Sequence, residues 1–424
     1  MFRPPKMVSY RVPDLQRARE WYSRVLGQPP AFDSPMASVF AVGDSSLTLV
    51  PLQEGGEAPA GGVAFWDVED IDDAYRRLVE AGAEPVTEIT LLMLRSRIAR
   101  LRDPFGNLVG IISASQKRTS IEDRPSESAL TVAFCRALAA RETREEIRGP
   151  DALAELFVAE ESTAVLKDPA ARRWVIEKLA GTYEFFIART AFGDGIFREA
   201  LRQRIPQVVL LGAGYDTRAY RFRDSNEATR IFELDALPTQ ERKRQILDRA
   251  RLAPPSSLAY VPINFEKQAP AEVLAGAGFA KGERTLFVWE GVTYYLSAEA
   301  VEATFAFIRD ASPPGSTLCF DYMVKAPDME ARYGVKAVFD QWRRTYASEH
   351  VQFGIDEDAI EAFLHRRGFG LIENLTPEDI ERRFLTLGDG SLAGRALALF
   401  NLAHASVAGP DGPGTAAPGQ GGRR

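Results

Sequence analysis

Residues 206–222 read PQVVLLGAGYDTRAYRF. In this stretch an apolar run ends in Gly212-Ala-Gly214, and a polar, helix-compatible segment follows at once. That order predicts a buried parallel strand that leads into a glycine turn, the kind of turn on which a nucleotide-like ligand lies. Gly212 and Gly214 allow the backbone to turn sharply and approach the ligand, because a Cβ at either place would intrude. A buried strand that merely ends in a glycine turn is the alternative interpretation.

An acidic residue at the end of the next predicted strand favours a ligand-binding turn over a purely structural one. Residues 230–235 (RIFELD) indicate a second strand, and Asp235 follows the glycines by about 20 residues, the spacing of a ribose-binding carboxylate. The motif that cradles a pyrophosphate needs a third glycine, and here Arg218 and Ala219 occupy that region. The pattern therefore favours a nucleoside without a pyrophosphate, and S-adenosylmethionine is the candidate.

Five motifs in the second part of the chain occur in a recognisable order and spacing. They are residues 188–190 (ART) with Asp194, 211–218 (LGAGYDTR), 232–235 (FELD), 261–266 (VPINFE) and 289–296 (WEGVTYYL). Together they resemble the leucine carboxyl methyltransferase family, whose members are S-adenosylmethionine-dependent O-methyltransferases. The resemblance covers roughly residues 130–405, and it implies a Rossmann-like class I methyltransferase sheet with a helical cap.

Strand-like and helical stretches alternate in this part, which is typical of a doubly wound parallel sheet in an α/β fold. The family resemblance implies that the last strand is antiparallel. A helical segment over 129–201 and the insert 324–353 would cap the carboxyl ends of the strands, where ligands of open α/β sheets bind. The expected strands are 207–211, 229–234, 258–263, 285–289, 317–322, 370–373 and 396–402.

The same motifs indicate which residues would hold the cofactor. The turn Gly212-Ala213-Gly214 would carry it, and we expect Asp235 to accept hydrogen bonds from both ribose hydroxyls. Arg189 would pair with the carboxylate of the methionine moiety, because a planar guanidinium fork suits that geometry. A surface salt bridge is the alternative for Arg189.

Further cofactor contacts are implied by the resemblance. Glu290, at a strand end, resembles the family's cofactor-contacting acid and would favour a positive sulfonium; the alternative is a structural partner for a helix N-terminus. Asn264, followed by Phe265, stands where many relatives carry Asp beside the adenine, and Asn keeps one acceptor and gains a donor. Arg136 would add a second cation near the cofactor carboxylate, unless it lies on a solvated helix face.

The acceptor site is less marked in the sequence. A carboxylate acceptor is nucleophilic at neutral pH and needs no base, whereas a phenol or alcohol would need one. Tyr294 and Tyr295 are the catalytic candidates, and Asp216 and His350 could also line the site. Tyr295 matches the family's tyrosine, for which packing is as good an interpretation as catalysis.

The first 115 residues contain an internal repeat. Residues 12–27 and 68–82 each give a strand end, an acidic N-cap (Asp14 or Asp70) and an amphipathic helix closed by a glycine. Residues 103–107 (DPFGN) indicate a turn. This repeated βαβββ unit resembles the vicinal-oxygen-chelate superfamily, which includes glyoxalase I and the extradiol dioxygenases. The expected strands after the two helices are 38–42, 47–51, 98–101 and 108–112.

Working members of that superfamily hold a divalent metal with His, Gln or Glu side chains from four strand positions. Here those positions fall at Met7, Val50, Gly62 and Gly110, and none offers a suitable ligand. We therefore expect a metal-free domain. Its aromatic residues either line a pocket between the modules or form the core: Trp21, Tyr22, Phe40, Phe65 and Trp66.

Length and composition are those of a globular protein with two or three domains. The chain has 424 residues and a formal net charge of −7, which gives no electrostatic reason to expect nucleic acid or an anionic membrane as partner. We find no run of about 18 apolar residues and no basic-then-apolar amino terminus, so we expect a cytoplasmic protein. Cys135 and Cys319 are expected to be reduced thiols.

These observations give a domain plan and a function hypothesis. We expect a vicinal-oxygen-chelate domain over 1–115, a linker over 116–129, a methyltransferase domain over 130–405 and a disordered tail over 406–424. The hypothesis is an O-methyltransferase of the bacterial polyketide type, as found in secondary metabolism, acting on a small natural-product-like carboxylate or hydroxyl. The first domain would bind the acceptor or mediate a homodimer.

Two other function classes stay open. One is a non-catalytic binding protein for small molecules, against which the intact cofactor motifs argue. The other is a lyase, isomerase or dioxygenase that works through the first domain, against which the missing metal ligands argue.

Overall fold

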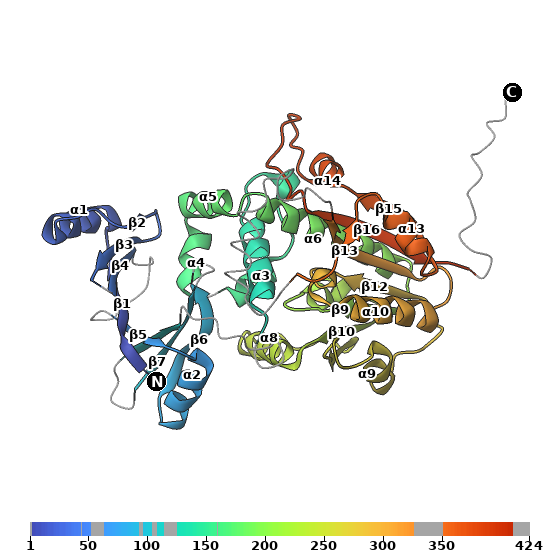
Figure 1. Cartoon of the computed structure of the whole chain (residues 1–424), viewed down its shortest axis with the longest axis horizontal. Helices are drawn as coiled ribbons and strands as arrows, with labels where there is room; N and C mark the ends of the chain where they lie inside the picture. Colours follow the sequence, from blue (N-terminus) through green and yellow to red (C-terminus); the bar gives the residue numbers. More distant parts are fainter. Residues whose placement is uncertain are drawn as a thin grey trace.

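The computed structural model of the chain describes residues 2–43, 45–51, 63–92, 96–103, 108–113, 125–158, 160–325 and 351–409. Two sheets dominate it, and they lie side by side along the long axis of the molecule (Figure 1). Each described strand pairs with strands of its own sheet. The expected fold class, an α+β unit of paired modules followed by a Rossmann-like α/β unit, is confirmed.

The N-terminal sheet consists of two βαβββ modules with the strand order β2-β3-β4-β1-β5-β8-β7-β6. β1 is parallel to β4 and β5 is parallel to β8, so each module closes on its own first strand. The modules join where β1 pairs antiparallel with β5. The first module contains β1 (Phe2–Val12), α1 (Leu15–Leu26), β2 (Phe32–Asp33), β3 (Ser38–Val42) and β4 (Ser45–Pro51). The second contains β5 (Val63–Val68), α2 (Ile71–Glu80), β6 (Glu84–Leu92), β7 (Ser96–Arg102) and β8 (Leu108–Ser113).

The two helices of these modules begin as the sequence predicts. The Asp14 carboxylate accepts a hydrogen bond from the backbone N of Arg17 at 2.9 Å, and Asp70 accepts one from Asp73 at 3.1 Å. These bonds satisfy backbone donors that the first turn of a helix leaves unpaired. α1 ends at Gly27 with a φ of 67°, which glycine adopts without strain.

The positions that would carry metal ligands are apolar in the structure. Met7 lies opposite Phe65 in the β1–β5 register, and both residues are buried in one small apolar cluster. A Cβ on Gly110 would lie 2.6 Å from the Phe65 ring, so no longer side chain fits there. Among the described residues, no three His, Cys, Asp or Glu side chains are arranged to hold a metal ion. Gly62 lies outside the described residues.

The predicted aromatic set of this domain divides into two groups. Phe40 and Phe65 are core residues, with exposed fractions of 0% and 4%. Trp21 and Trp66 are exposed instead, and Tyr22 lies between Trp21 and Phe40 in ring contact with both. The core interpretation therefore holds for the two phenylalanines and not for the two tryptophans.

The C-terminal sheet has the order β11-β10-β9-β12-β13-β16-β15, with β14 beside β13. β9, β10, β11, β12 and β13 are parallel, and β16 is antiparallel to both β13 and β15. The expected antiparallel last strand is therefore confirmed. The strand order reverses between β9 and β12, which is where an open α/β sheet forms a ligand crevice. The strands are β9 (Gln207–Leu211), β10 (Arg230–Asp235), β11 (Leu258–Pro262), β12 (Thr285–Trp289), β13 (Thr317–Lys325), β14 (Ile355–Asp356), β15 (Phe369–Leu375) and β16 (Phe400–Val407).

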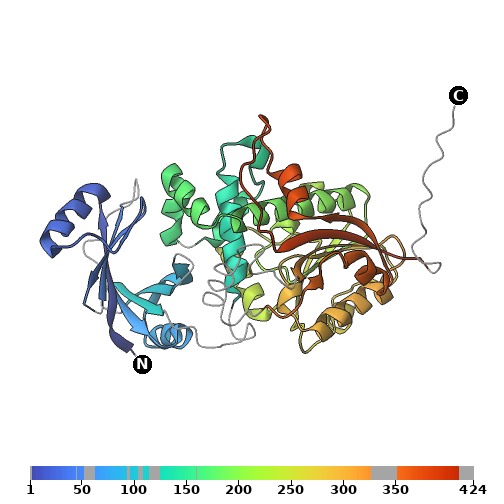
Figure 2. The ribbon, with the colours of Figure 1, turned by 45° about the horizontal axis from the view of Figure 1, so that its top comes forward.

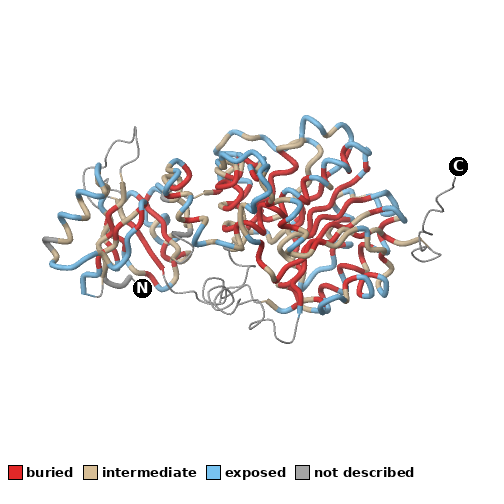
Figure 3. The backbone as a smooth tube through the Cα atoms, turned by 90° about the horizontal axis from the view of Figure 1, so that it is seen from above, coloured by how far each residue is buried: buried red, intermediate tan, exposed pale blue. Residues whose placement is uncertain are grey.

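Helices cover both faces of this sheet, and the buried residues concentrate in its strands (Figure 3). Those before β9 are α3 (Glu127–Ala140), η1 (Glu145–Ile147), η2 (Ala152–Phe157), α4 (Glu160–Lys167), α5 (Pro169–Lys178) and α6 (Thr182–Arg202), as the expected helical segment requires. Those after β9 are α7 (Arg218–Arg221), η3 (Arg223–Ser225), α8 (Leu237–Arg249), α9 (Pro270–Gly276), η4 (Thr293–Tyr295), α10 (Ala298–Ala311), α13 (Ile360–His365) and α14 (Pro377–Phe384). None of the described helices is long and apolar enough to cross a bilayer.

Several predicted segments differ from the structure at their boundaries, and two differ for a clear reason. The strand expected over 396–402 begins only at Phe400, because earlier backbone groups have partners outside the sheet: the N of Ala396 donates to the Glu381 carboxylate, and the N of Leu397 donates to the O of Gly181. The capping insert expected over 324–353 begins inside β13, which continues to Lys325. Residues 326–350 of that insert lie outside the described residues, as do 104–107 of the predicted turn, 116–124 of the linker and 410–424 of the tail; α3 begins at Glu127, inside the expected linker, and β16 continues to Val407, inside the expected tail.

Candidate active site

A cavity of about 710 Å³ lies at the carboxyl ends of β9, β10 and β12. Its other walls include residues of α3, of the end of α5, of α6, of the start of α8, of the segment after β11 and of η4. Asp216 also lines it, whereas His350 lies outside the described residues. The structure brings every predicted site residue to this cavity: Arg136, Arg189, Gly212, Ala213, Gly214, Asp235, Asn264, Phe265, Glu290, Tyr294 and Tyr295.

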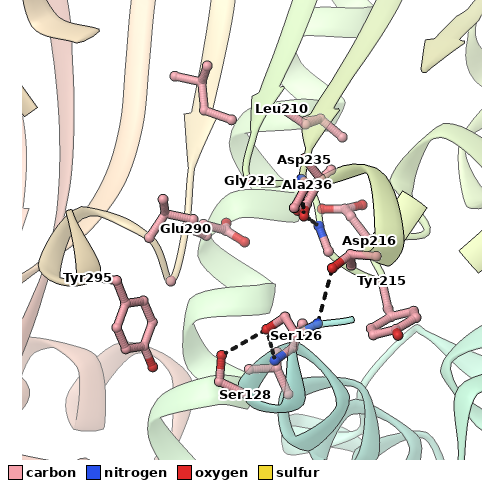
Figure 4. Close-up of a pocket in the computed structure, with 18 of the residues that line it drawn as sticks. Ser126, Ser128, Leu210, Gly212, Tyr215, Asp216, Asp235, Ala236, Glu290 and Tyr295 are labelled. Atoms are coloured by element: carbon pink, nitrogen blue, oxygen red, sulfur yellow. Dashed lines mark hydrogen bonds between the residues drawn. The ribbon is translucent and has the colours of Figure 1, made fainter. Parts of the chain in front are cut away.

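The glycine turn and Asp235 form one hydrogen-bonded unit on this cavity wall (Figure 4). The backbone N of Gly214 donates to Oδ2 of Asp235 at 2.6 Å, and the N of Ala236 donates to Oδ1 at 2.7 Å. A carboxylate has about four acceptor sites, so these two bonds orient the group and do not by themselves saturate it. Asp235 thus presents a fixed carboxylate at the end of β10.

Gly212 and Gly214 both have the left-handed backbone that glycine permits, with φ of 72° and 51°. A Cβ on Gly212 would lie 2.2 Å from Cγ2 of Val292, and one on Gly214 would lie 3.1 Å from Cβ of Ala129. The close approach at Gly212 is therefore to the loop after β12. The approach of a ligand to the same turn, which the sequence led us to expect, stays a prediction.

Arg189, on α6, is a buried residue that pairs with a carboxylate of β13. Its Nη1 lies 2.7 Å from Oδ2 of Asp321, whose other oxygen accepts a bond from the backbone N of Gly291 at 2.6 Å. The surface salt bridge considered for Arg189 is thus wrong, because both partners are buried. The Nε of Arg189 is buried and has no hydrogen-bond partner among the described residues. This nitrogen is enclosed by protein atoms, and Arg189 lines the cavity through other atoms of its side chain.

Glu290 follows β12 and is held by Arg218. Nη1 of Arg218 lies 3.0 Å from Oε2 of Glu290, and Nη2 lies 3.0 Å from Oε1. The partner of Glu290 is thus a guanidinium, and the alternative of a helix N-terminus is wrong. Burial raises the pKa of Glu290, and the positive charge of Arg218 opposes this effect. The ionised form of Glu290 is therefore stabilised by its pairing with Arg218.

Arg218 holds two further carboxylates. Its Nε donates to Asp194 at 2.8 Å and its Nη1 to Asp216 at 2.7 Å, and the side chain is almost fully buried. Asp194 also accepts two bonds from Arg221. Because their arginine partners outweigh the effect of burial, the pKa of Asp194 is lowered and that of Asp216 falls to about 2. Both acids are therefore ionised at neutral pH.

Two residues that build this site, Arg218 and Gly193, were not predicted from the sequence. A Cβ on Gly193, in the middle of α6, would lie 2.0 Å from Oε1 of Glu290. A signal existed for each residue. Arg218 shares its motif with Asp216, and Gly193 interrupts a helical stretch, where glycine is unfavourable unless packing requires it.

Arg136 is buried between α3 and neighbouring segments. Its Nη2 donates to the backbone O of Tyr215 at 2.7 Å, and its Nε lies 3.4 Å from Asp151. The alternative of a solvated helix face is wrong, because only 8% of the residue is exposed. Arg136 therefore supports the segment that follows the glycine turn.

Asn264 forms a turn of its own after β11. Its Oδ1 accepts a bond from the backbone N of Glu266 at 3.0 Å. Glu266 in turn accepts two bonds from Ser297 at the start of α10, each 3.0 Å long. The side-chain oxygen predicted to face adenine thus also fixes the local backbone, and Phe265 follows it at the cavity wall.

Tyr295 lies on the opposite side of the cavity from Gly212 and Asp235 (Figure 4), and Tyr294 also lines the cavity. Their ring centroids are 4.7 Å apart. Gln352 holds this segment through its backbone N, which donates to the O of Tyr294 at 2.7 Å, and through its side chain, which donates to the O of Tyr295 at 2.8 Å. Tyr294 is almost fully buried and Tyr295 is half-buried.

Comparison with known proteins agrees with this geometry. Residues 129–309 match the leucine carboxyl methyltransferase family. Residues 5–111 match the superfamily of glyoxalase, bleomycin resistance protein and dioxygenase. The chain belongs to the leucine carboxyl methyltransferase family and carries a glyoxalase-superfamily domain before the catalytic unit.

Individual relatives cover the catalytic unit. A Streptomyces coelicolor protein, provisionally named an S-adenosyl-L-methionine-dependent methyltransferase, is 33% identical over 195 residues, which are 45% of this chain and 67% of that protein. A Bacillus subtilis protein with the same provisional name is 29% identical, over 47% of this chain and 66% of its own length. The chain spans between about half and two thirds of the length of the curated relatives that it matches. It is also similar to a solved DUF574 family protein of Streptomyces avermitilis, with 14% identity and a TM-score of 0.44, over 68% of this chain and 98% of that one.

Proposed function

We propose that this protein is an S-adenosylmethionine-dependent methyltransferase that methylates a carboxylate or hydroxyl oxygen of a small molecule. One observation carries the proposal. At the crevice of the sheet, the carboxylate of Asp235 is fixed by the backbone of Gly214 and Ala236, beside a glycine turn without the third glycine of a pyrophosphate site. This is the environment that a nucleoside with a free ribose needs.

The residues present fit the cofactor. Asp235 would accept bonds from the ribose hydroxyls, and Arg189, which lines the cavity, would pair with the methionine carboxylate. Asn264 and Phe265 would border the adenine, and Arg136 would add positive charge near the carboxylate end. Glu290, held at the cavity wall by Arg218, would contact the cofactor beside its sulfonium.

The protein needs to contribute little covalent chemistry to methyl transfer. When bound, S-adenosylmethionine supplies a methyl group already activated on a sulfonium. The residues of this cavity orient the two reactants and exclude water, and orientation alone is worth roughly 7–11 kcal/mol in favourable cases. Arg218 contributes by keeping the Glu290 carboxylate at the cavity wall.

The acceptor would lie near Tyr294 and Tyr295. A carboxylate acceptor would react without a base, and the tyrosine rings would then serve as its walls. A hydroxyl acceptor would need a proton acceptor, a role open to Tyr295 because the residue is half-buried and lines the cavity. Comparing a carboxylic acid with its alcohol analogue as acceptor would separate these two cases.

The N-terminal domain is proposed as an accessory module that helps to bind the acceptor or joins two copies of the chain. The competing role, catalysis by the N-terminal domain itself, is disfavoured because the Phe65 ring fills the space beside Gly110. Light scattering of the intact protein tests the homodimer.

Titration calorimetry with S-adenosylmethionine tests the main proposal. We expect micromolar binding by the wild-type protein and at least a hundredfold loss in Asp235→Ala, since the substitution removes the ribose acceptor and the bonds to Gly214 and Ala236. Asp224→Asn is the matched control, because the Asp224 side chain is 96% exposed. Absence of binding by the wild-type protein would refute the proposal and favour the non-catalytic binding protein.

A further inference from the structure

The first module of the N-terminal domain packs on α5. Met36 is buried in the same apolar cluster as Ala171 and Val175 of that helix. The Phe32 ring meets the Trp174 ring edge to face, with centroids 5.5 Å apart and an interplanar angle of 79°. Such aromatic pairs add about 0.5–1.5 kcal/mol beyond the area they bury. β2 and the residues that follow it thus pack against the middle of α5.

The second module contacts α8. Nη2 of Arg249 lies 2.6 Å from Oε1 of Glu88, and Arg242 donates a hydrogen bond to the backbone O of Ile89. Glu88 is oriented from its own domain by the hydroxyl of Tyr75, at 3.2 Å. In Figures 1 and 2, α4 and α5 lie between the N-terminal sheet and the rest of the catalytic unit.

Both contacted helices form walls of the cavity. The last residue of α5, Lys178, lines it together with the two residues that follow. The first residues of α8, from Leu237 to Thr239, line it next to Asp235. The N-terminal domain therefore supports two walls from outside.

Lys178 differs from the other cations of the cavity. Arg136 lies near Asp151, and Arg189 is paired with Asp321. Among the described residues, Lys178 has no carboxylate partner, and its recorded contact is with the Trp174 ring, 5.6 Å from Nζ to the centroid. Trp174 precedes Lys178 by one helical turn, so the ring that touches Phe32 is also the ring that supports the ammonium group.

We propose that Lys178 recognises an anionic group of the acceptor, and that Phe32 of the N-terminal domain positions Lys178 through Trp174. The proposal rests on the proposed function and narrows it to acceptors that carry an anionic group, for which a carboxylate is the probe. Lys178 is the specificity residue, since it contacts the substrate. Phe32 is a positioning residue, since it acts through Trp174 and Lys178.

Benzoate and benzamide are suitable probes, because they have nearly equal size and differ in charge. Their affinities are measured by ligand-observed NMR on the full-length protein saturated with S-adenosylhomocysteine. We expect benzoate to bind more tightly than benzamide. Lys178→Met is expected to weaken benzoate binding about threefold to fivefold and to leave benzamide unchanged, as the loss of an exposed ion pair predicts.

The role of Phe32 is tested by a double-mutant cycle. Phe32→Ala is expected to weaken benzoate binding, and Phe32→Ala combined with Lys178→Met is expected to be no weaker than Lys178→Met alone, because the two residues act in series. Trp21→Ala is the matched control, an exposed aromatic residue of the same domain on α1. A purely structural effect of Phe32 would add to that of Lys178 and would lower benzamide affinity equally.

The outcomes separate this proposal from the one on which it rests. Equal affinities for the two probes, no benzoate binding, or additive losses in the cycle would overturn it, while unchanged titrations with S-adenosylmethionine would leave the proposed function standing. Failure of the wild-type protein to bind S-adenosylmethionine would overturn both.

Discussion

Arg218 and Glu290 form a two-point ion pair in the wall of the cavity, with both Nη–Oε distances at 3.0 Å. The same guanidinium donates to Asp194 of α6 and to Asp216 after β9. One buried cation therefore connects carboxylates from three separate segments. The glycine turn, the upstream motif and the strand end after β12 depend on each other through this single side chain.

Arg218→Met is expected to lower the free energy of unfolding by about 3–5 kcal/mol, because it leaves buried carboxylates without their partner. Urea denaturation measures the change. The control is Arg223→Met, since the Arg223 side chain is 53% exposed and lies 3.6 Å from Asp224. That variant should stay within about 0.5 kcal/mol of the wild type. Equal losses of stability in Arg218→Met and Arg223→Met would contradict the role of Arg218 in holding the buried carboxylates.

Two glycines of α6 allow a matched comparison. Gly193→Ala is expected to destabilise the protein by about 1–3 kcal/mol and to weaken S-adenosylmethionine binding, since its Cβ would lie 2.0 Å from Oε1 of Glu290. A Cβ added at Gly195 would have no neighbouring atom within 4 Å. Gly195→Ala should therefore stabilise the helix by up to about 1 kcal/mol. Thermal melts and calorimetry give both readouts. If both variants were stabilised, the close approach of Glu290 to α6 would be wrong.

Asp216 gives the protein a defined acid sensitivity. Burial raises the pKa of Asp216, but Arg218 and other nearby cations lower it by more than burial raises it. The pKa therefore falls to about 2 from a usual 3.8. The unfolded carboxyl therefore takes up a proton before the folded one, so this stabilisation is complete above about pH 4 and is lost as the pH falls towards 2. Its size is about 2 kcal/mol.

Asp216→Asn keeps the shape of the side chain and removes the charge. We expect the variant to be less stable at pH 7 and to lose less stability than the wild type between pH 4 and pH 2, measured by urea denaturation at each pH. Asp224→Asn should keep the wild-type pH dependence. A variant of Asp216 with the wild-type slope would show that another group accounts for the acid sensitivity.

Features that depend on neighbouring residues were predictable from the sequence. The strands 207–211 and 285–289 have the expected bounds, because each is a short apolar run closed by polar or glycine residues. Asp14 and Asp70 cap their helices as expected, since an N-cap bond joins residues only three apart. The strand expected over 396–402 failed, because distant partners bind the backbone of its first residues.

The sequence by itself thus determined the two sheets, the glycine turn and the position of Asp235 at the end of β10, since strand periodicity and turn chemistry act over a few residues. Only the tertiary structure decided which charges pair. Arg189 and Asp321 are 132 residues apart, and Arg218 and Glu290 are 72 apart. A charged residue has the same local signature on a surface as in a buried pair. Its partner is set by how the helices pack on the sheet, and the contact of Phe32 with Trp174 is set by how two domains meet.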